Sequence, residues 1–483
     1  MKKTALFGAL ALVSGAFAAP IPIQGYMLDI SRSKVPEMRA LHRMVDVLAK
    51  LGYNQFQLYT EHTFAYKGHE AAWRTASPMT PAEIRDLDAY CASKGIELVP
   101  NQNSFGHLGE WLRHPDYNDL AECPQGGAIY KKWRSVFPRP EAICPTDPRS
   151  LDFVAGLYDQ LFPCFRSHLV NVGCDETLEL FNDNEPRIGR SAAIVAKKSA
   201  PRVYFDFLKG IYGLVAERGH KMMFWGDIVL RHPELVDDLP KDLICLNWGY
   251  EANHPFESQA SVFEKSGRTF YVCPGTSTWS APSGRTTNML GNIDNALAAG
   301  ERHGAAGVLL TDWGDHGHMQ PWISSLPALV YLSHRRKGET MTRDQLAAAI
   351  DRLVGAKCGR ALIRLGDAYL KVGGRMGNTS ELSFLLREGK DYVRGKGVTD
   401  ETLAAGMAEW RAAMAERDLT GAPDWVKDGF AVLDLLEEAI NRRIADPAAK
   451  NFRAMFEPRY RALWLKHNRP GGLDRSLETV FSK

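Results

Sequence analysis

SHLVNVGCDET, from Ser167 to Thr177, is a short apolar run that ends at a glycine and is followed at once by two adjacent carboxylates, Asp175 and Glu176. Such a run is typical of a buried strand. Two acids directly after it are costly unless they face water, a partner or a ligand. Because most acidic residues are solvated, the pair alone would predict only an exposed loop. The other strand ends of the chain therefore have to decide whether this position is a functional site.

The chain has 483 residues, of which 45% are hydrophobic, and a net charge of +2. This length indicates two or more domains, or one large barrel with an appendage. A net charge so close to zero, without a basic tract, argues against an electrostatic grip on nucleic acid or anionic lipid. We therefore expect a globular protein with no nucleic-acid partner.

The first 18 residues have the pattern of a secretory signal. Lys2 and Lys3 precede a short apolar run over residues 4–13, and small residues follow at Ala16 and Ala18. This pattern predicts cleavage after about Ala18 and export to the periplasm or the medium. The segment is too short for a spanning helix, and we expect no membrane span elsewhere in the chain.

Eight short apolar strands are predicted, mostly alternating with helical stretches, of which the clearest cover 35–51, 81–94 and 293–303. The strands cover residues 21–30, 54–59, 96–100, 168–174, 221–225, 243–248, 269–273 and 307–311. Such alternation implies parallel strands joined by crossover helices, and eight units match a (β/α)8 TIM barrel, here over 19–340. A doubly wound open sheet is the second interpretation, but no Gly-x-Gly-x-x-Gly turn follows the first strand.

Residues 341–483 differ from the barrel because they contain no convincing strand. Apolar residues recur at helical spacing over 345–354, 403–414, 426–440 and 452–465. This periodicity predicts an all-helical C-terminal region that packs on the barrel. The sequence leaves open whether these helices form a homodimer interface or a lid, and it leaves the oligomeric state open.

Polar and aromatic residues follow every predicted strand, and in a TIM barrel these positions meet at one rim where active sites form. In chain order they are Asp29 and Arg32; Glu61 and His62; Asn101, Asn103 and His107; Asp175 and Glu176; Trp225 and Asp227; Asn247, Trp248 and Tyr250; Trp279; and Trp313 and Asp315. Tryptophan faces cover the C–H faces of a pyranose, while charged and amide groups hold its hydroxyls. Taken singly, each residue is better explained as core or surface. Their joint placement predicts a sugar-binding pocket.

Metal and disulfide chemistry have weaker support. His62 and His107 could ligate a metal, but no third nitrogen or thiolate ligand stands out, so we expect neither a metal nor a cofactor. Of eight cysteines, Cys174, Cys245 and Cys273 fall in or beside core strands, where a buried free thiol is the more common state. Cys123 and Cys144 flank one long loop and could form a disulfide in an exported protein.

The ordered strand-end motifs resemble glycoside hydrolase family 20, the β-N-acetylhexosaminidases. The motifs are Gly25-Tyr26-Met27-Leu28-Asp29-Ile30-Ser31-Arg32, Phe105-Gly106-His107 and Gly173-Cys174-Asp175-Glu176. The run from Leu51 to Tyr66, together with Phe105-Gly106-His107-Leu108, is most similar to the hexosaminidase D branch. The resemblance covers roughly residues 23–330. It implies a (β/α)8 barrel that removes terminal N-acetylhexosamine from glycans or glycoconjugates by substrate-assisted, retaining hydrolysis.

The resemblance also implies a role for each residue. Asp175 would orient the acetamide of the substrate, and Glu176 would act as the acid and then the base, which requires a raised pKa. Arg32, with Asp29 and Asp315, would hold the outer hydroxyls, and the tryptophans Trp225, Trp248, Trp279 and Trp313 would wall the pocket. His107 with Glu61 resembles a histidine–carboxylate relay that supports the acid, although His62 could align there instead.

The chain departs from the family pattern at several positions. Asn171 stands where the family has histidine, Cys174 replaces a second glycine, and Asp315 stands where glutamate is common. The tyrosine that binds the acetamide oxygen has two candidates, Tyr250 and Tyr271, with Trp279 close to the expected place. These departures keep two alternatives open: another glycosidase that uses Asp175 as a direct nucleophile, and a non-catalytic glycan-binding barrel.

Overall fold

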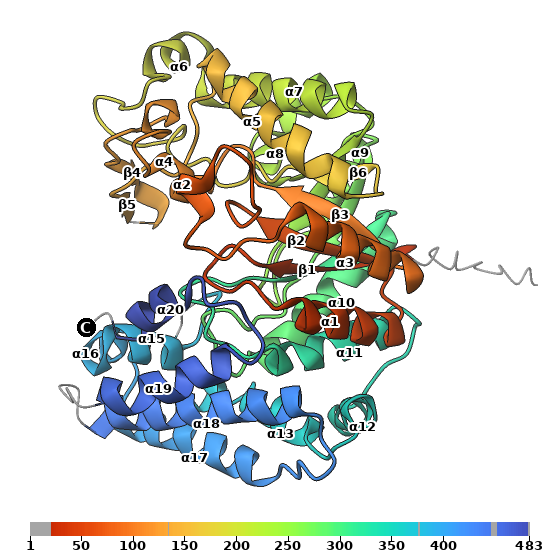
Figure 1. Cartoon of the computed structure of the whole chain (residues 1–483), viewed down its shortest axis with the longest axis vertical. Coiled ribbons are helices and arrows are strands. Elements are labelled where there is room, and N and C mark those ends of the chain that lie inside the picture. Colours follow the sequence, from red (N-terminus) through yellow and green to blue (C-terminus); the bar gives the residue numbers. More distant parts are fainter. Residues whose placement is uncertain (1–20, 134, 375–376, 446–451, 482–483) are drawn as a thin grey trace, which may run out of the picture.

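Eight parallel strands form a closed barrel at the centre of the protein (Figure 1), in the order β1-β10-β9-β8-β7-β6-β3-β2. This computed structural model describes residues 21–133, 135–374, 377–445 and 452–481, so the predicted signal segment lies outside the described residues. The closed order confirms the TIM barrel and excludes the open sheet. The barrel strands are β1 (Ile23–Asp29), β2 (Gln55–Thr60), β3 (Glu97–Gln102), β6 (Leu169–Asn171), β7 (Lys221–Trp225), β8 (Ile244–Trp248), β9 (Thr269–Cys273) and β10 (Gly307–Asp312).

Helices surround the barrel. The longer ones are α1 (Met38–Lys50), α3 (Pro81–Ser93), α5 (Pro148–Leu161), α7 (Ala200–Glu217), α9 (Phe256–Lys265), α10 (Thr286–Arg302) and α11 (Leu326–Arg335). All of these but α11, which follows the last strand, lie between consecutive barrel strands. Short helices in the strand-exit loops are α2 (Glu70–Trp73), α4 (Gly109–Leu112), α6 (Ala192–Lys198) and α8 (Asp227–Arg231). The start of α3 shows how local sequence sets these bounds. Thr80 and Glu83 form a reciprocal capping box, and Pro81 occupies the first turn.

Polar side chains fill one layer of the barrel interior. The Oε1 atom of Gln57 accepts hydrogen bonds from Nδ2 of Asn101 at 3.0 Å and Nδ2 of Asn171 at 3.1 Å. The Oδ1 atom of Asn171 accepts in turn from the backbone N–H of Gly173 at 3.0 Å. Because all these side chains are buried, each needs such a partner. Asn171 therefore fixes the backbone just after the end of β6 by accepting this hydrogen bond from Gly173.

The structure differs from the sequence prediction in the length of this fourth barrel strand. The predicted strand ran to Cys174, whereas β6 ends at Asn171. The backbone after it leaves the extended conformation, with φ of +68° at Gly173 and +69° at Cys174. A small antiparallel hairpin, β4 (Ala128–Tyr130) with β5 (Ser135–Phe137), was not predicted, since three-residue strands leave almost no periodic pattern.

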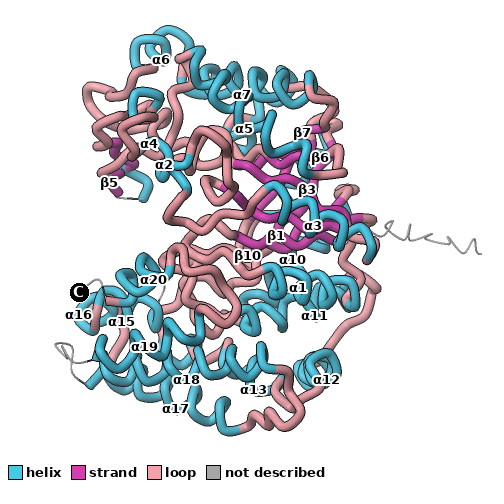
Figure 2. The backbone as a smooth tube through the Cα atoms, in the orientation of Figure 1, coloured by secondary structure: helices cyan, strands magenta, loops and turns pink. Residues whose placement is uncertain are grey.

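Beyond residue 340, every regular element in the described part of the chain is a helix, as predicted, and Figure 2 shows these helices and the loops between them below the barrel. The helices of this C-terminal region are α12 (Arg343–Val354), α13 (Gly359–Leu365), α14 (Tyr369–Val372), α15 (Glu381–Glu388), α16 (Lys390–Arg394), α17 (Asp400–Ala415), α18 (Asp424–Ala445), α19 (Phe452–Trp464) and α20 (Leu473–Val480). The five short ones, α13 to α16 and α20, were not predicted. Arg469 fastens the region to the barrel, because its guanidinium bonds Glu83 at 2.7 Å and the Pro78 carbonyl at 2.8 Å.

All eight cysteines lie within the described ranges, and each is a buried free thiol. The Cys123–Cys144 disulfide that the sequence allowed is therefore not formed, whereas the buried thiols expected at Cys174, Cys245 and Cys273 are confirmed. Of the helices in the described part of the chain, none combines the length and apolar character that crossing a bilayer requires.

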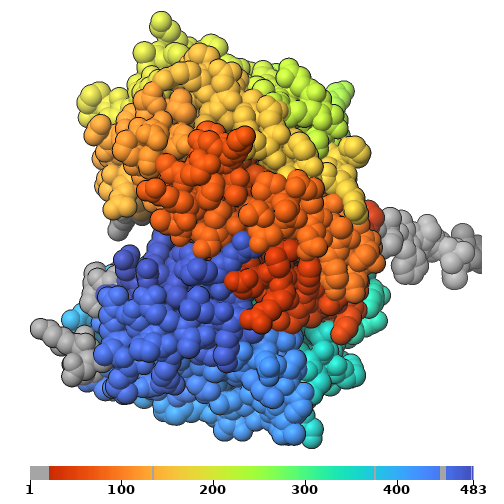
Figure 3. Space-filling model, in the orientation of Figure 1, coloured from red at the N-terminus to blue at the C-terminus, as the bar shows by residue number. Residues whose placement is uncertain are grey.

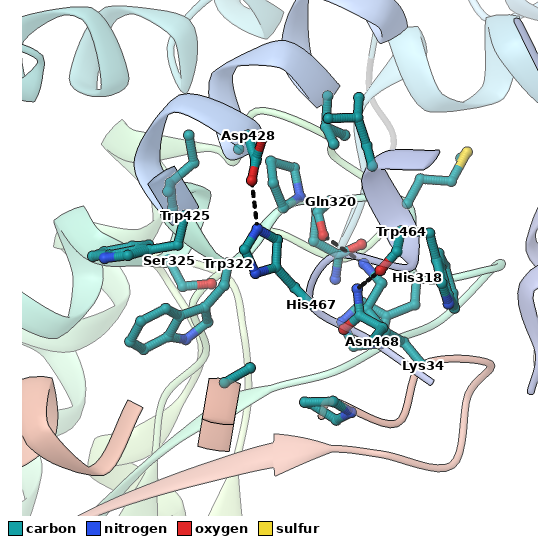
Figure 4. Close-up of a pocket in the computed structure, with 18 of the residues that line it drawn as sticks. Lys34, His318, Gln320, Trp322, Ser325, Trp425, Asp428, Trp464, His467 and Asn468 are labelled. Atoms are coloured by element: carbon teal, nitrogen blue, oxygen red, sulfur yellow. Dashed lines mark hydrogen bonds and ion pairs between the residues drawn. The ribbon is translucent and has the colours of Figure 1, made fainter. Parts of the chain in front are cut away.

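A small cavity of about 90 Å³ lies in the seam between the barrel and the C-terminal helices. Figure 4 shows Trp322 and Trp425 lying near one another at one end, and Lys34 beside Trp464 at the other. The Nζ atom of Lys34 donates to the Gln320 carbonyl at 2.9 Å. Burial lowers the pKa of Lys34 to about 7, against the opposing charge of Asp312. The amine is thus kept in a place that disfavours its charged form.

We expect Lys34→Met to change the pH dependence of thermal stability. In the unfolded chain a lysine keeps its proton up to about pH 10.4. Between about pH 7 and 10 the unfolded wild type binds more protons than the folded protein, so its stability rises by at most ~1.4 kcal/mol per pH unit at this position. The melting temperature of the wild type minus that of the variant should therefore increase with pH over this range. Below about pH 7 this difference should stay constant.

A matched control is Lys466→Met, which removes an exposed lysine that pairs with Asp428 beside the same seam. Its melting-temperature difference from the wild type should stay level across the same range. Parallel curves for the wild type and Lys34→Met would show that the Lys34 amine titrates as in water.

Candidate active site

A cavity of about 1280 Å³ opens at the carboxyl ends of the barrel strands. In Figure 3 the surface is notched between the orange segment that contains β4 and β5 and the blue C-terminal helices. Nine of the residues predicted for the site line this cavity together: Arg32, His107, Asp175, Glu176, Trp225, Trp248, Tyr250, Trp313 and Asp315. The barrel therefore brings the acid pair, the arginine and an aromatic wall to one place.

Asp175 and Glu176 both face this cavity although they are neighbours in the chain. On a continuing strand, consecutive side chains point to opposite faces. Here the strand has already ended, and Gly173, Cys174 and Glu176 all have positive φ, of 68°, 69° and 47°. The left-handed turns rotate the second carboxylate to the same side as the first. Glycine adopts this conformation freely, whereas the other two residues do so at a cost of roughly 1–2 kcal/mol each.

Neighbouring atoms hold this turn in place. The Tyr204 hydroxyl donates to the Cys174 carbonyl at 2.8 Å, and the Trp225 N–H donates to the Gly173 carbonyl at 3.0 Å. A Cβ atom on Gly173 would lie 2.6 Å from the Asn103 side chain, whose Nδ2 donates to Asp175 at 3.1 Å. Asn103 thus needs a glycine at 173 in order to reach the carboxylate.

Arg32 lies among acidic and aromatic groups at the rim of the cavity. Its guanidinium contacts Asp29 at 3.0 Å, Glu61 at 3.5 Å and Asp315 at 3.3 Å. The same group lies 5.0 Å from the ring centroids of both Tyr59 and Trp313. So many contacts hold the side chain in one orientation, with a fifth of it still exposed to the cavity.

Asp29 positions Arg32 from beneath and does not line the cavity. Its carboxylate is fully buried, accepts from the Arg32 side chain and from the backbone N–H groups of Ser31 and Arg32, and also accepts from Gly314 N–H at 2.9 Å. Gly314 belongs to the loop that leaves β10. Asp29 therefore ties the exits of the first and last barrel strands together.

His107 lies between the arginine and the acid pair. Its Nε2 atom is 3.4 Å from Asp175 and 3.6 Å from Glu176, and its Nδ1 atom is 3.3 Å from the Arg32 guanidinium. Burial alone would lower the pKa of His107, but the charge of Asp175 and its hydrogen bond raise it. Arg32 can donate to Nδ1 only while the ring is neutral, so its charge opposes the protonation that the carboxylates favour.

The two acids of the pair have different environments. Burial would raise the pKa of Asp175, but the charge and hydrogen bond of His107, with Arg32, lower it below its usual range. Burial raises the pKa of Glu176, and the negative charges of Asp175 and Asp315 add to this effect. Asp175 therefore stays ionised to a lower pH than a free aspartate, whereas Glu176 holds its proton to a higher pH than a free glutamate, and such a difference lets two acids play different roles.

Glu61 and His62, the two candidates for a relay with His107, lie outside the lining of the cavity. Glu61 accepts from the Tyr59 hydroxyl at 2.9 Å, and burial raises its pKa to about 7. Its link to His107 runs through Arg32, which contacts both side chains. His62 is buried near Glu110 and Arg475, and burial lowers its pKa to about 4.

The aromatic wall consists of Trp225, Trp248, Tyr250 and Trp313. Trp248 stacks on Tyr250 with ring centroids 5.3 Å apart, and the Trp313 Nε1–H donates to the Tyr250 hydroxyl oxygen at 2.8 Å. This hydrogen bond occupies the oxygen as an acceptor and leaves its proton for another partner. Of the two tyrosine candidates only Tyr250 lines the cavity, because Tyr271 lies in the barrel interior. Trp279 is buried behind Tyr250, edge-on at 4.9 Å.

Part of the cavity lining was not predicted from sequence. It comes from the β5 hairpin and from the C-terminal helices, and includes Val136, Phe137, Arg387, Glu388, Arg475 and Glu478. These residues are far from the barrel motifs in the chain, and no strand end precedes them. Val136 is an apolar residue that is 60% exposed, and the sequence gives no sign of that exposure.

Three side chains have the spacing of a metal site. The ligand atoms of His107, Asp175 and Glu176 lie within 4.8 Å of one another. The guanidinium of Arg32 approaches the same histidine at 3.3 Å, which makes this an unfavourable place for a cation. A histidine and two carboxyls at this spacing are equally suited to proton transfer.

This chain is similar to known proteins in sequence and in fold. The family model described as "Glycosyl hydrolase family 20, catalytic domain" matches residues 22–299. A beta-hexosaminidase of Emericella nidulans is 22% identical over 48% of this chain and 40% of its own, and human Hexosaminidase D is 20% identical over 64% of each. The chain therefore spans less than two thirds of the length of these relatives. The Flavobacterium johnsoniae chitobiase structure covers 94% of this chain and is itself covered over 77%, with a TM-score of 0.53 and 16% identity, a likeness of fold.

We expect Gly173→Ala to destabilise the protein more than Gly219→Ala, its matched control. Both glycines have φ near +70°, so both substitutions incur a left-handed backbone cost of about 1–2 kcal/mol. A Cβ at 219 meets nothing within 4 Å, whereas one at 173 meets Asn103 at 2.6 Å. The larger drop in melting temperature should therefore belong to Gly173→Ala. Equal drops would mean that Asn103 moves aside without cost.

Proposed function

The chain belongs to glycosyl hydrolase family 20, and we propose from this that it is an exo-acting β-N-acetylhexosaminidase, which removes terminal N-acetylglucosamine or N-acetylgalactosamine from a glycan or glycoconjugate. The observation that supports this most directly is the placement of two consecutive carboxyls, Asp175 and Glu176, in one cavity with a tryptophan wall and Arg32. A single terminal sugar fits such a site, since its apolar face needs an aromatic surface and its hydroxyls need fixed charges.

In the proposed mechanism the substrate supplies its own nucleophile. The acetamido oxygen attacks C1 while Glu176 gives its proton to the leaving oxygen, so that the glycosidic bond breaks and an oxazolinium ion forms. Asp175, kept ionised by His107, orients the acetamide N–H and offsets the positive charge. Water then attacks C1 and gives a proton to Glu176, while the bond between C1 and the acetamido oxygen breaks and the acetamide is restored, with net retention at C1.

The remaining residues of the cavity have proposed roles in binding. Arg32 and Asp315, which are 3.3 Å apart, would hold the outer hydroxyls of the sugar. Trp225, Trp248 and Trp313 would cover its ring and acetamide. Tyr250 would donate to the acetamide oxygen, because its own oxygen already accepts from Trp313. Asp29 and Glu61 would act through Arg32 and His107 rather than on the sugar itself.

We expect Glu176→Gln to lower kcat on p-nitrophenyl N-acetyl-β-hexosaminides by about 10²–10⁴-fold, the usual contribution of a general acid. Glutamine keeps the size of the side chain, so the loss should come without a loss of thermal stability. The matched control is Glu257→Gln on the exposed face of α9, where the carboxylate pairs with Arg302 and kcat should not change. A folded wild type with no turnover on either the gluco or the galacto substrate would refute the proposal.

A thiazoline mimic of the oxazolinium ion distinguishes the substrate-assisted route from direct attack by Asp175. Because transition-state and intermediate mimics bind at least about 10²-fold tighter than substrate, the mimic should inhibit strongly if the acetamide is the nucleophile. Turnover without such inhibition would instead favour Asp175 as the nucleophile. Tight binding of N-acetylhexosamine without turnover would indicate a glycan-binding barrel.

The protein is further proposed to be exported and cleaved after about Ala18. Lys2, Lys3 and the apolar run over residues 4–13 support this, because they make up the charged and apolar parts of a signal peptide. After expression of the full chain, the mature protein should be recovered from the periplasm or medium with Ala19 as its first residue by N-terminal sequencing. Full-length protein confined to the cytoplasm would contradict export.

A further inference from the structure

A second, smaller cavity of about 130 Å³ adjoins the acid pair. Glu176 and His107 line both this cavity and the large one, so the small cavity opens beside the proposed acid. The rest of its lining comes from Phe137, Glu141, Ala142, Leu178 and Glu179. Glu179 follows Glu176 by three positions and has no part in the mechanism above.

The Glu179 carboxyl has one oxygen bonded and one oxygen without a partner. Its Oε2 atom accepts from the backbone N–H groups of Ala142 at 2.6 Å and Glu141 at 3.2 Å. Its Oε1 atom is buried and has no hydrogen-bond partner among the described residues, and the residue is only 1% exposed. Leaving such a group unpaired costs roughly 1–3 kcal/mol, so the geometry calls for a partner in the cavity.

The cavity is suited to water. A single water needs about 10–15 Å³ of accessible volume and two to four polar partners. The volume here is several times larger, and the residues that line it include Glu179, Glu176, Glu141 and His107. Water in this space can therefore connect the carboxyls of Glu176 and Glu179.

We propose that Glu179 is a positioning residue for Glu176. The two carboxyls share one proton through water in the small cavity, and this sharing keeps Glu176 protonated in the free enzyme. In each exchange Glu179 releases its proton to a water, which passes one of its own to Glu176. One O–H bond breaks at Glu179, one forms at Glu176, and the water is regenerated. The proton sharing is inferred from the cavity alone, whereas its role in catalysis rests on the proposed function.

Burial shifts the pKa of both carboxyls of the pair upward, toward the protonated form. Burial raises the pKa of Glu179 to about 8, although the backbone N–H groups of Ala142 and Glu141 oppose the shift. Burial also raises the pKa of Glu176. Two coupled acids lose their protons in two macroscopic steps, and the second proton is held up to a higher pH than either group alone would hold it. The charged and titratable groups that face the pair are His107, Arg32, Asp175, Asp227 and Asp315 around Glu176, and Glu122, Glu141 and Cys123 around Glu179.

The test is a titration of Glu176 by difference infrared spectroscopy, with its carboxyl band identified by its loss in Glu176→Gln. In the wild type we expect Glu176 to deprotonate in two steps over a wide pH range. In Glu179→Gln, which keeps the oxygen that accepts from Ala142, we expect one step that ends about one pH unit lower, since one unit is a typical effect of a neighbouring carboxyl. This readout needs no turnover, so it remains informative if the proposed activity fails.

Kinetics supply the second readout. The alkaline limb of kcat/KM, which reports the free enzyme, should move to lower pH by about one unit in Glu179→Gln, with kcat at acidic pH unchanged. Asp88→Asn is the matched control: it too removes a buried carboxyl whose pKa is raised by burial, but Asp88 pairs with Arg166 and lines neither cavity. In this control variant, the infrared titration of Glu176 and the alkaline limb of kcat/KM should both match those of the wild type.

A single-step Glu176 titration in the wild type, or identical curves for the wild type and Glu179→Gln, would overturn the proposal. A purely structural role would lower the melting temperature and the activity at every pH without moving the limb. If Glu179→Gln does not fold, Ala142→Val tests the same point from the other wall. Its added methyl groups reduce the space for water, so it should convert the two-step titration into one step, and an unchanged two-step curve would again refute the proposal.

Discussion

Everything in the site depends on where β6 stops. A strand that ran on through Cys174 would send Asp175 and Glu176 to opposite faces, one into the barrel wall. Ending the strand at Asn171 and placing Gly173, Cys174 and Glu176 at positive φ brings both acids into one cavity. The cost of two non-glycine residues in this conformation is tolerated because the surrounding hydrogen bonds, from Tyr204, Trp225 and Asn171, all favour the same turn. Backbone strain at this position thus goes together with the chemistry.

A second constraint is the balance of charge around Arg32. Its guanidinium faces Asp29, Glu61 and Asp315, and its approach to His107 limits the protonation of that ring. His107 in turn keeps Asp175 ionised, and Asp175 helps Glu176 to keep its proton. The different roles proposed for two adjacent carboxyls therefore follow from a chain of contacts that begins at the exit of β1. Removing one member would alter the protonation of the others.

Much of this arrangement could be predicted from the sequence, because barrel strands are short apolar runs and their ends carry polar and aromatic residues. The acid pair, His107, Arg32, Asp315 and the aromatic residues Trp225, Trp248, Tyr250 and Trp313 all line the cavity, as predicted. Asp29 and Glu61 lie behind Arg32, and Trp279 lies behind Tyr250, since a strand-end position does not say how deep a side chain sits. The early end of β6 and the walls from β5, α15 and α20 could not be predicted. A left-handed turn at Cys174 has no residue signature, and short helices far along the chain give no sign of folding back over the barrel mouth.

The part of the chain that matches the family model ends at residue 299, before β10, Trp313 and Asp315, and well before the helices that complete the cavity wall. The wall of the cavity is therefore built from segments on both sides of the point where this match ends. Arg469, which follows α19, binds Glu83 in the first half of the chain and so connects the C-terminal region to the barrel. Moving the barrel alone into another protein would leave the cavity without the side chains that α15 and α20 contribute to its wall.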